Sequence, residues 1–172
     1  MAKSSEPVIQ EKGKSAIDTS ILDTIDGKLP SQKGQMDIMS ILKKGLEARK
    51  TGMPFEMFAS LVGARMKSPR NSMVKINNTA FMVRREPNDS KKVEFSMISA
   101  DSSKNASKCI MGFYKFLKNQ KILSASTTEE TPQFVELYKN SGVPLKVSVT
   151  EGFYGKERKP EYLITFDMRR MA

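Results

Sequence analysis

A chain of 172 residues with 38% hydrophobic residues and nine phenylalanines can bury a core of its own, so a wholly disordered chain is excluded. The absence of histidine excludes serine–histidine and cysteine–histidine catalytic pairs and every zinc site that needs an imidazole. A formal net charge of +10 favours acidic or polyanionic partners. With a single cysteine, no apolar run of the roughly 18 residues that a membrane span needs and no signal-peptide core, we expect an unsecreted, soluble protein of a reducing compartment.

Residues 1–34 are predicted to form an extended N-terminal arm. This segment is rich in Ser, Lys, Gly and Pro, and its lysines are balanced by equal numbers of acidic residues, so the net charge lies in the rest of the chain. Its apolar residues are isolated until the run 20-SILDTI-25. Because such a composition cannot build a core, we expect the arm to dock on a neighbouring subunit through anchors such as Val8, Ile9 and Ile17.

Two helices are predicted after the arm. Apolar residues recur at helical spacing from Gln35, and Gly52 can close the first helix. Pro54 suits the start of the second helix, which Pro69 should end. The apolar faces comprise Met36, Met39, Leu42 and Leu46 in the first helix and Phe55, Phe58, Leu61 and Val62 in the second.

Three strand-like runs follow at residues 73–76, 79–86 and 93–100. Turn-forming residues separate them, Asn77-Asn78 in the first gap and Pro87-Asn88-Asp89 in the second. This spacing predicts an antiparallel meander.

The most amphipathic helix is predicted over residues 103–120, after a cap at Ser102 or Ser103. Its apolar face consists of Ala106, Cys109, Ile110, Phe113 and Leu117, and its basic face of Lys104, Lys108, Lys115 and Lys118. Cys109 lies on the apolar face, so we interpret it as a core residue rather than a nucleophile.

The last elements are a strand at 121–127, a helix that begins after Thr128 and ends at Gly142, and two strands at 145–151 and 161–168. The last two strands alternate in polarity and are joined by a glycine-rich, basic turn.

This order of elements resembles the fold of the GCN5-related N-acetyltransferases (GNAT). In that family a helix with the pattern Tyr-x-x-x-Gly-Phe ends just before the sixth strand, and Tyr138, Gly142 and Val143 occupy those places, with Val in place of Phe. The resemblance implies an α+β domain over residues 35–172, with a mixed, mostly antiparallel sheet flanked by helices. It makes residues 20–25 a candidate first strand.

The resemblance gives Tyr138 the candidate role of protonating the departing thiolate of coenzyme A, but a tyrosine that packs at a helix end is the favoured interpretation. Family enzymes hold the pyrophosphate of the cofactor on a glycine-rich loop at a helix start. The corresponding stretch here, 99-SADSSKNASK-108, contains no glycine, and Asp101 adds a negative charge. Ser103 and Lys104 compensate in part. We therefore expect no cofactor, and neither cofactor nor metal ligands are assigned.

Four acidic residues are candidates for catalytic groups. Glu86 and Glu94 could each act as a base through a water molecule, but a solvated strand residue is the simpler interpretation. Glu129 and Glu130 are predicted in a first helical turn, where carboxylates favour the helix dipole without any catalytic role.

Basic residues in the folded part are candidates for contacts with phosphates. They are Arg65, Lys67, Arg70, Lys75, Arg84, Arg85, Lys104, Lys108, Lys115 and Lys118. Solvated surface charge is the alternative interpretation. Aromatic residues are not interleaved with the basic ones, so base-specific stacking is not predicted.

Three classes of function remain open. The first is a non-enzymatic structural or adaptor protein of a larger assembly, by analogy with a small internal virion protein of T7-like phages that is similar to the acetyltransferase fold. Its expected location is a virion head, portal neck or tail, or the cytoplasm if the gene is not of phage origin. The second is an acetyl-coenzyme A-dependent N-acetyltransferase with an atypical cofactor loop. The third is an accessory protein that binds nucleic acid without sequence preference.

Overall fold

The computed structural model describes residues 36–151 and 160–169. The predicted arm, the candidate strand at 20–25 and the basic turn before the last strand therefore lie outside the described residues. The helices are α2 (Ile38–Arg49), α3 (Phe55–Met66), α4 (Ser103–Asn119) and α5 (Pro132–Lys139). The strands are β1 (Asn71–Ile76), β2 (Thr79–Glu86), β3 (Asp89–Ser99), β4 (Ser124–Glu129), β5 (Leu145–Glu151) and β6 (Pro160–Phe166).

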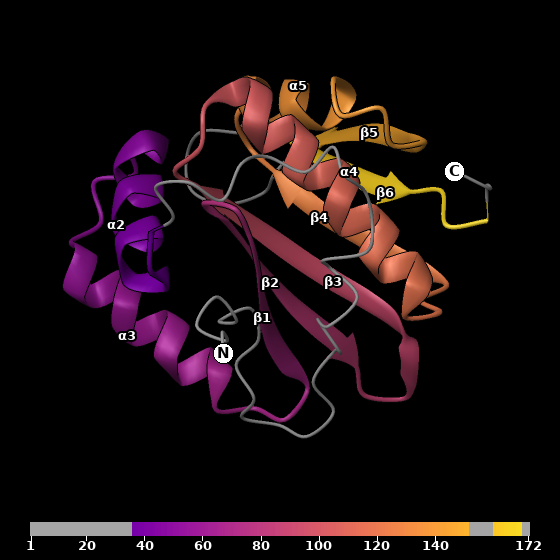
Figure 1. The fold of residues 1–172 in the computed structure, drawn as a ribbon, viewed down its shortest axis with the longest axis horizontal. Coiled ribbons are helices and arrows are strands. Elements are labelled where there is room, and N and C mark those ends of the chain that lie inside the picture. The colour runs from indigo at the N-terminus through magenta and orange to yellow at the C-terminus, as the bar shows by residue number, and fades with distance from the viewer. Residues whose placement is uncertain (1–35, 152–159, 170–172) are drawn as a thin grey trace.

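The described strands form one six-stranded sheet in the order β1-β2-β3-β4-β6-β5 (Figure 1). All neighbouring strands are antiparallel except β3 and β4, which run parallel. The meander β1-β2-β3 confirms the prediction from the two turns. The parallel pair requires a crossover, which α4 provides.

Helices cover both faces of the sheet, with α2 and α3 on one side and α4 on the other (Figure 1). The larger core cluster joins the α4 and α5 side chains to one face of the sheet, and it includes stacked rings of Phe81 and Phe113, whose centroids are 4.1 Å apart. The smaller cluster joins α2 and α3 to Met73, Ala80 and Ile98. The fold is therefore the α+β arrangement predicted from the sequence.

Local signals explain where the helices begin and end. Asp37 caps α2 by accepting a hydrogen bond from the Ser40 amide at 2.8 Å, and Lys50, at φ 53°, ends it. The predicted Ser102 cap of α4 is confirmed, since its hydroxyl accepts from the Asn105 amide at 3.2 Å. The prediction that Gly52 closes α2 is wrong, because Lys50 already adopts the left-handed conformation two residues earlier.

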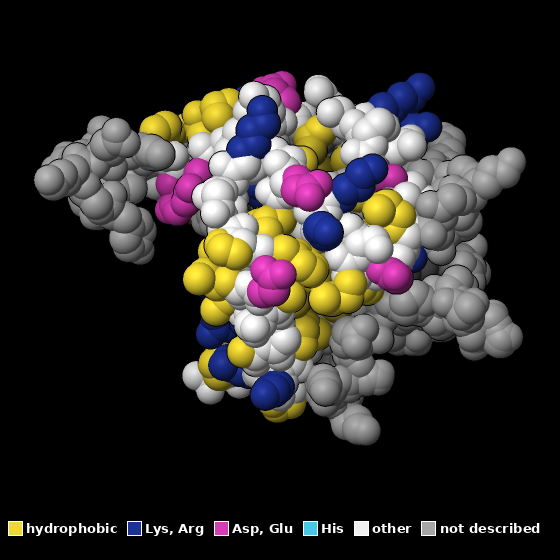
Figure 2. All heavy atoms as spheres, turned by 90° about the vertical axis from the view of Figure 1, so that its left-hand side faces the viewer, with side chains coloured by type: hydrophobic (Ala, Val, Ile, Leu, Met, Phe, Trp, Pro, Cys, Tyr) yellow, Lys and Arg dark blue, Asp and Glu magenta, His cyan; other side chains and the backbone are white. Residues whose placement is uncertain are grey.

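The outer surface of α2 and α3 carries exposed apolar side chains (Figure 2). Met39 and Leu61, which were predicted on the inner faces, are 52% and 48% exposed. Met57 is also exposed, at 53%. Ile41 of α2, which the predicted apolar face did not include, is fully buried. The hydrophobic pattern located both helices correctly but assigned some exposed residues to their buried faces.

The segment between α4 and α5 differs most from the prediction. Strand β4 begins at Ser124 and runs through Glu129, beyond the predicted Thr128 cap. Helix α5 begins only at Pro132, after Thr131, whose side chain makes no capping hydrogen bond. Glu129 is thus the last residue of a strand and not part of a first helical turn, which alters the interpretation of its carboxylate.

Cys109 is fully buried, as predicted, and its thiol donates to the Ile76 carbonyl at 3.3 Å. Burial raises the pKa of this thiol well above its ordinary value. Within residues 36–151 and 160–169, no helix is long and apolar enough to cross a membrane.

Candidate active site in the opening between two strands

The parallel strands β3 and β4 pair along only part of their length. Residues 92–94 of β3 are in register with residues 124–126 of β4, and no further residues of the two strands pair; we call the unpaired end, from Phe95 on β3 and Thr127 on β4, the opening. Arg49, the last residue of α2, lies across the resulting opening. One of its nitrogens contacts the Met97 carbonyl of β3, and both contact the Glu129 carboxylate of β4.

The Arg49–Glu129 pair has the two-point geometry of a strong ion pair. The Nη1–Oε1 distance is 2.9 Å, the Nη2–Oε2 distance is 3.1 Å, and Nη2 also donates to the Met97 carbonyl at 2.7 Å. The side chain of Glu129 is 3% exposed and that of Arg49 is 23% exposed, and the Phe134 ring lies 4.2 Å from the guanidinium. Burial acts to lower the pKa of Arg49, but hydrogen bonding and the charge of Glu129 outweigh it and raise that pKa above its ordinary value.

Tyr138, the tyrosine of the Tyr-x-x-x-Gly pattern, reaches the same opening from α5. Its side chain is fully buried, with its ring packed against Phe95 and Phe166. Its hydroxyl and that of Thr127 on β4 are both buried without a hydrogen-bond partner among the described residues. A hydrogen bond with Thr127 acts to lower the pKa of Tyr138, although the two hydroxyls do not meet strict hydrogen-bonding geometry.

Burial, followed by the negative charge of Glu129, raises the pKa of Tyr138 well above its ordinary value. Arg49 and Thr127 act in the opposite direction without cancelling this effect. The Tyr138 hydroxyl is therefore protonated at neutral pH and can donate a proton. Tyr114 is equally buried, but its hydroxyl donates a hydrogen bond to the Asp167 carbonyl at 3.1 Å. The two buried tyrosines of this core therefore differ in how their hydroxyls are satisfied.

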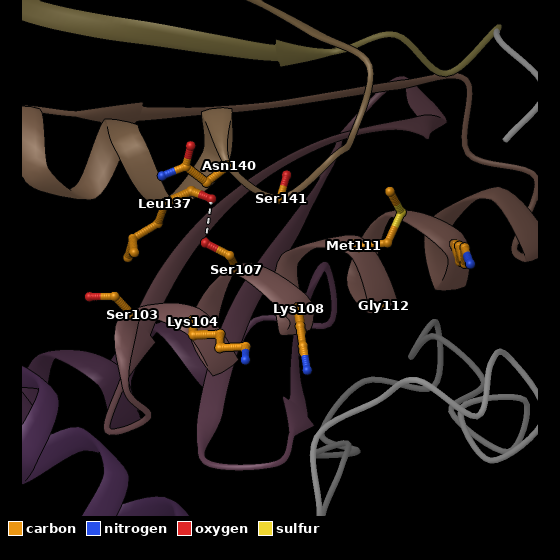
Figure 3. Close-up of a pocket in the computed structure, with 10 residues that line it drawn as sticks. Ser103, Lys104, Ser107, Lys108, Met111, Gly112, Leu137, Asn140 and Ser141 are labelled. Atoms are coloured by element: carbon orange, nitrogen blue, oxygen red, sulfur yellow. Dashed lines mark hydrogen bonds between the residues drawn. The ribbon is translucent and has the colours of Figure 1, made fainter.

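A cavity of about 530 Å³ lies between α4 and α5. Its wall includes Lys104, Lys108 and Lys115 and no acidic residue. The Ser107 hydroxyl spans the two helices and donates to the Leu137 carbonyl at 2.8 Å (Figure 3). Lys104 and Lys108 extend from α4 away from the labelled α5 residues (Figure 3), so the mouth of the cavity is positively charged.

The start of α4 shows one feature that the sequence interpretation did not contain. The Asp101 carboxylate is held by hydrogen bonds from the β1–β2 turn. These come from Asn77 Nδ2 at 2.6 Å, the Asn78 amide at 3.1 Å and the Thr79 hydroxyl at 2.7 Å. Ser103 and Lys104 remain at the cavity wall, where the sequence predicted them.

The predicted basic residues do not form one surface. Lys104, Lys108 and Lys115 line the cavity beside α5, whereas Arg65, Arg70 and Arg84 line a different cavity at the end of α3. Lys67 is exposed on the chain segment after α3.

The remaining predicted basic residues are engaged individually. Lys75 is 6% exposed, and burial lowers its pKa despite the charges of Asp37 and Asp101. Arg85 donates to the Ser90 carbonyl, and burial lowers its pKa as well.

Lys118 bonds the Met168 carbonyl at 3.4 Å and lies 5.6 Å from the Tyr114 ring centre. Contact with a nucleic acid by the whole set stays a prediction.

Glu94 is the last β3 residue in register with β4, so its backbone lies at the edge of the opening, but the Glu94 and Glu86 side chains lie elsewhere. Glu94 is exposed and lines the cavity at the end of α3. Glu86 is partly buried at an irregular register of β2 and β3, near Asp89. Neither is among the residues that surround the Tyr138 hydroxyl.

Gly142 has a purely local explanation. It follows the last turn of α5 with φ +85°, a conformation that glycine adopts readily, and a Cβ there would lie 3.3 Å from the methyl carbon of Met111. The glycine of the pattern therefore serves the turn, and only the tyrosine reaches the opening between the strands.

No protein family model and no curated protein matches the sequence. The structure is similar to a putative acetyltransferase from Salmonella typhimurium, solved with its cofactor acetyl-CoA, at a TM-score of 0.53 and 10% identity over 84% of this chain and 94% of that one. It is also similar to a GNAT-family acetyltransferase from Bacillus anthracis, at a TM-score of 0.52 and 14% identity over 77% and 86% of the two chains. A putative phosphinothricin N-acetyltransferase gives a TM-score of 0.51 at 10% identity over 83% and 98%.

The fold is that of the GNAT acetyltransferases. This confirms the resemblance stated from the order of elements, because the similarity extends over most of each chain. None of these structures connects the chain with virion proteins of T7-like phages.

Sequence reasoning placed Tyr138 near the end of a helix, where the structure has it in α5, but it did not select Arg49 or Thr127 and assigned Glu129 to the wrong element. Arg49 looked like an ordinary basic residue at a helix end, and its partner lies 80 residues away. The alternation of Ala125, Thr127 and Glu129 on one face of a strand was the available signal, but it was overlooked because the strand was ended too early.

Proposed function

We propose that this protein is an acetyltransferase-type enzyme with an atypical cofactor loop, which binds an acyl thioester of coenzyme A between β3 and β4. The observation that carries the proposal is the pair of buried hydroxyls of Thr127 and Tyr138 at that opening, neither of which makes a hydrogen bond of strict geometry with a described residue. Buried polar atoms in native proteins nearly always have a partner, so two adjacent exceptions indicate a ligand or ordered water.

The residues fit the proposed ligand at both ends. Ser103 and Lys104 at the α4 start, with Lys108 and Lys115 along the cavity, would hold the phosphates. The Tyr138 hydroxyl would face the sulfur. The thioester supplies an acyl group bonded to a leaving thiolate.

The chain's contribution to chemistry rests on one proton. The Tyr138 hydroxyl is protonated at neutral pH and can donate a hydrogen bond to a departing thiolate. Its raised pKa, however, makes it a weaker acid than an ordinary tyrosine, so complete proton transfer requires that the bound ligand lower this pKa. The rings of Phe95 and Phe166 lie beside the Tyr138 ring, each with its centroid 6.3 Å away, and help to hold it in place.

Two features weaken the expected affinity. The α4 start lacks the glycines that let a backbone approach phosphates closely, so side chains must make those contacts. The Arg49–Glu129 pair also bridges the opening, and it must separate or shift before an acyl group can enter.

Calorimetry with acetyl-coenzyme A tests this proposal. We expect saturable binding that is weakened at least tenfold by Lys104→Glu and that falls with added salt. Lys92→Glu is the matched control, because Lys92 is exposed on β3, lies outside the cavity wall and undergoes the same charge change. Absence of binding up to millimolar ligand, or equal loss in both variants, would reject the proposed site.

The second candidate is a non-enzymatic component of a larger assembly, and the Arg49–Glu129 pair itself favours it. An opening that is closed by a bidentate ion pair needs no ligand to be stable. In the form suggested by the sequence, the assembly is a virion and the segment 1–34 docks on a neighbouring subunit. The test is size-exclusion chromatography with light scattering: a larger assembly that disappears on deletion of residues 1–19, together with no thioester binding, supports this candidate.

A further inference from the structure

A second cavity, of about 410 Å³, lies at the C-terminal end of α3. It is bounded by the connection from α3 to β1 and by neighbouring residues of β2 and β3. Met82 of its wall also packs against the core cluster of α2 and α3, so this cavity opens on the α2–α3 side of the sheet. The lysine-lined cavity lies instead on the side of α4 and α5.

Three arginines from different elements converge on this second cavity. Arg65 is in the last turn of α3, Arg70 precedes β1, and Arg84 is on β2. The acidic residue of the wall is Glu94, which is the register partner of Arg84. None of the three arginines forms an ion pair with a carboxylate of the described residues, so the wall keeps an excess of positive charge.

Arg70 supplies the observation that distinguishes this cavity from a solvated basic surface. Its Nη1 atom is buried and has no hydrogen-bond partner among the described residues. The neighbouring Asn71 Oδ1 is buried and unpartnered as well, while Asn71 Nδ2 donates to the Arg65 carbonyl at 2.6 Å. A buried guanidinium nitrogen without an acceptor is costly, and a bound oxyanion would remove that cost.

We propose that this cavity binds a small molecule through a carboxylate or phosphate group held by Arg70, Arg65 and Arg84. A guanidinium offers a planar fork of donors that matches both kinds of oxyanion. Met82 provides an apolar contact for the carbon part of such a ligand, and the volume suits a small molecule. This inference goes beyond the proposed function, because it needs neither the opening between the strands nor a thioester.

Titration of the full-length, ¹⁵N-labelled protein by NMR tests the proposal, with inorganic phosphate and glutarate as separate probes and sodium chloride as the ionic-strength control. We expect one probe to give saturable shifts of the Arg70 side-chain Nε–Hε signal that sodium chloride does not reproduce. The probe that saturates identifies the oxyanion. Shifts that rise linearly with both probes and with chloride alike would overturn the proposal.

Variants separate a built site from general electrostatic attraction. Arg84→Ala should weaken binding at least fivefold, and Arg70→Met should abolish it. Lys67→Ala is the matched control, since Lys67 is exposed, carries the same charge and lies outside the cavity wall. Arg84 is exposed, so its variant should fold even if Arg70→Met does not. Equal weakening by Lys67→Ala and Arg84→Ala would overturn the proposal.

Discussion

Replacing Arg49 with alanine should destabilise the protein far more than a surface charge change does. The substitution removes two hydrogen bonds to Glu129, at 2.9 and 3.1 Å, and leaves a carboxylate that is 3% exposed without its partner. Removing one member of a buried ion pair typically costs about 3–5 kcal/mol. For a chain of this length, each kcal/mol lowers the melting temperature by about 2–4 °C.

Urea denaturation of a double-mutant cycle measures this contribution directly. Glu129→Gln removes the buried charge, so the Arg49→Ala/Glu129→Gln variant should recover about 1–3 kcal/mol of the loss seen in Arg49→Ala. Lys139→Ala is the control: its pair with Glu136 is 3.6 Å apart and half exposed, and pairs of that kind contribute about 0–1 kcal/mol. If Arg49→Ala costs no more than Lys139→Ala, Arg49 does not bridge the strands as described.

Three further predictions concern single positions. Gly45→Ala should destabilise the fold by about 1–3 kcal/mol, because its Cβ would lie 2.2 Å from Ile98 Cγ1. Gly63→Ala has no atom within 4 Å of the new Cβ and should stabilise the fold by up to about 1 kcal/mol. Thermal melts of the two variants check both expectations. Tyr138 has a raised pKa in the folded state, so it contributes stability that is present below about pH 10 and lost as the pH rises further. In denaturant titrations between about pH 9 and 11, the Tyr138→Phe variant should therefore lose less stability than the wild type. Buried Cys109, with its raised pKa, should react with a thiol reagent only at the rate of unfolding, and fast labelling of the native protein would contradict its placement.

Most of the architecture was predictable because it depends on local signals. Periodicity and turn residues located the meander, and the Ser102 cap and the apolar side of the next helix located α4 with nearly correct ends. The error at 128–131 has a local cause, since Thr128 followed by two glutamates imitates a helix start. Pro132 was the better signal, because proline favours the first turn of a helix.

The candidate site was less predictable, because its residues meet only through the fold. Tyr138 was found through a resemblance, but its partners Arg49 and Glu129 come from α2 and β4 and carry no mutual sequence signal. The partners of Asp101 were unpredictable for the same reason: its hydrogen bonds from Asn77, Asn78 and Thr79 come from a turn more than 20 residues earlier. Spacing can propose that a residue is near a site, but it cannot say which way the side chain points.

The most direct test of the thioester site compares acetyl-coenzyme A binding by the wild type and by Arg49→Ala/Glu129→Gln in one calorimetric series. If the ion pair closes an opening that otherwise accepts the ligand, removing it should tighten binding at least tenfold, because the ligand no longer has to displace Arg49. Introducing Lys104→Glu into the double variant should reverse that gain. If the wild type and the double variant are both folded and neither binds acetyl-coenzyme A up to millimolar concentration, the opening between β3 and β4 is not a thioester site.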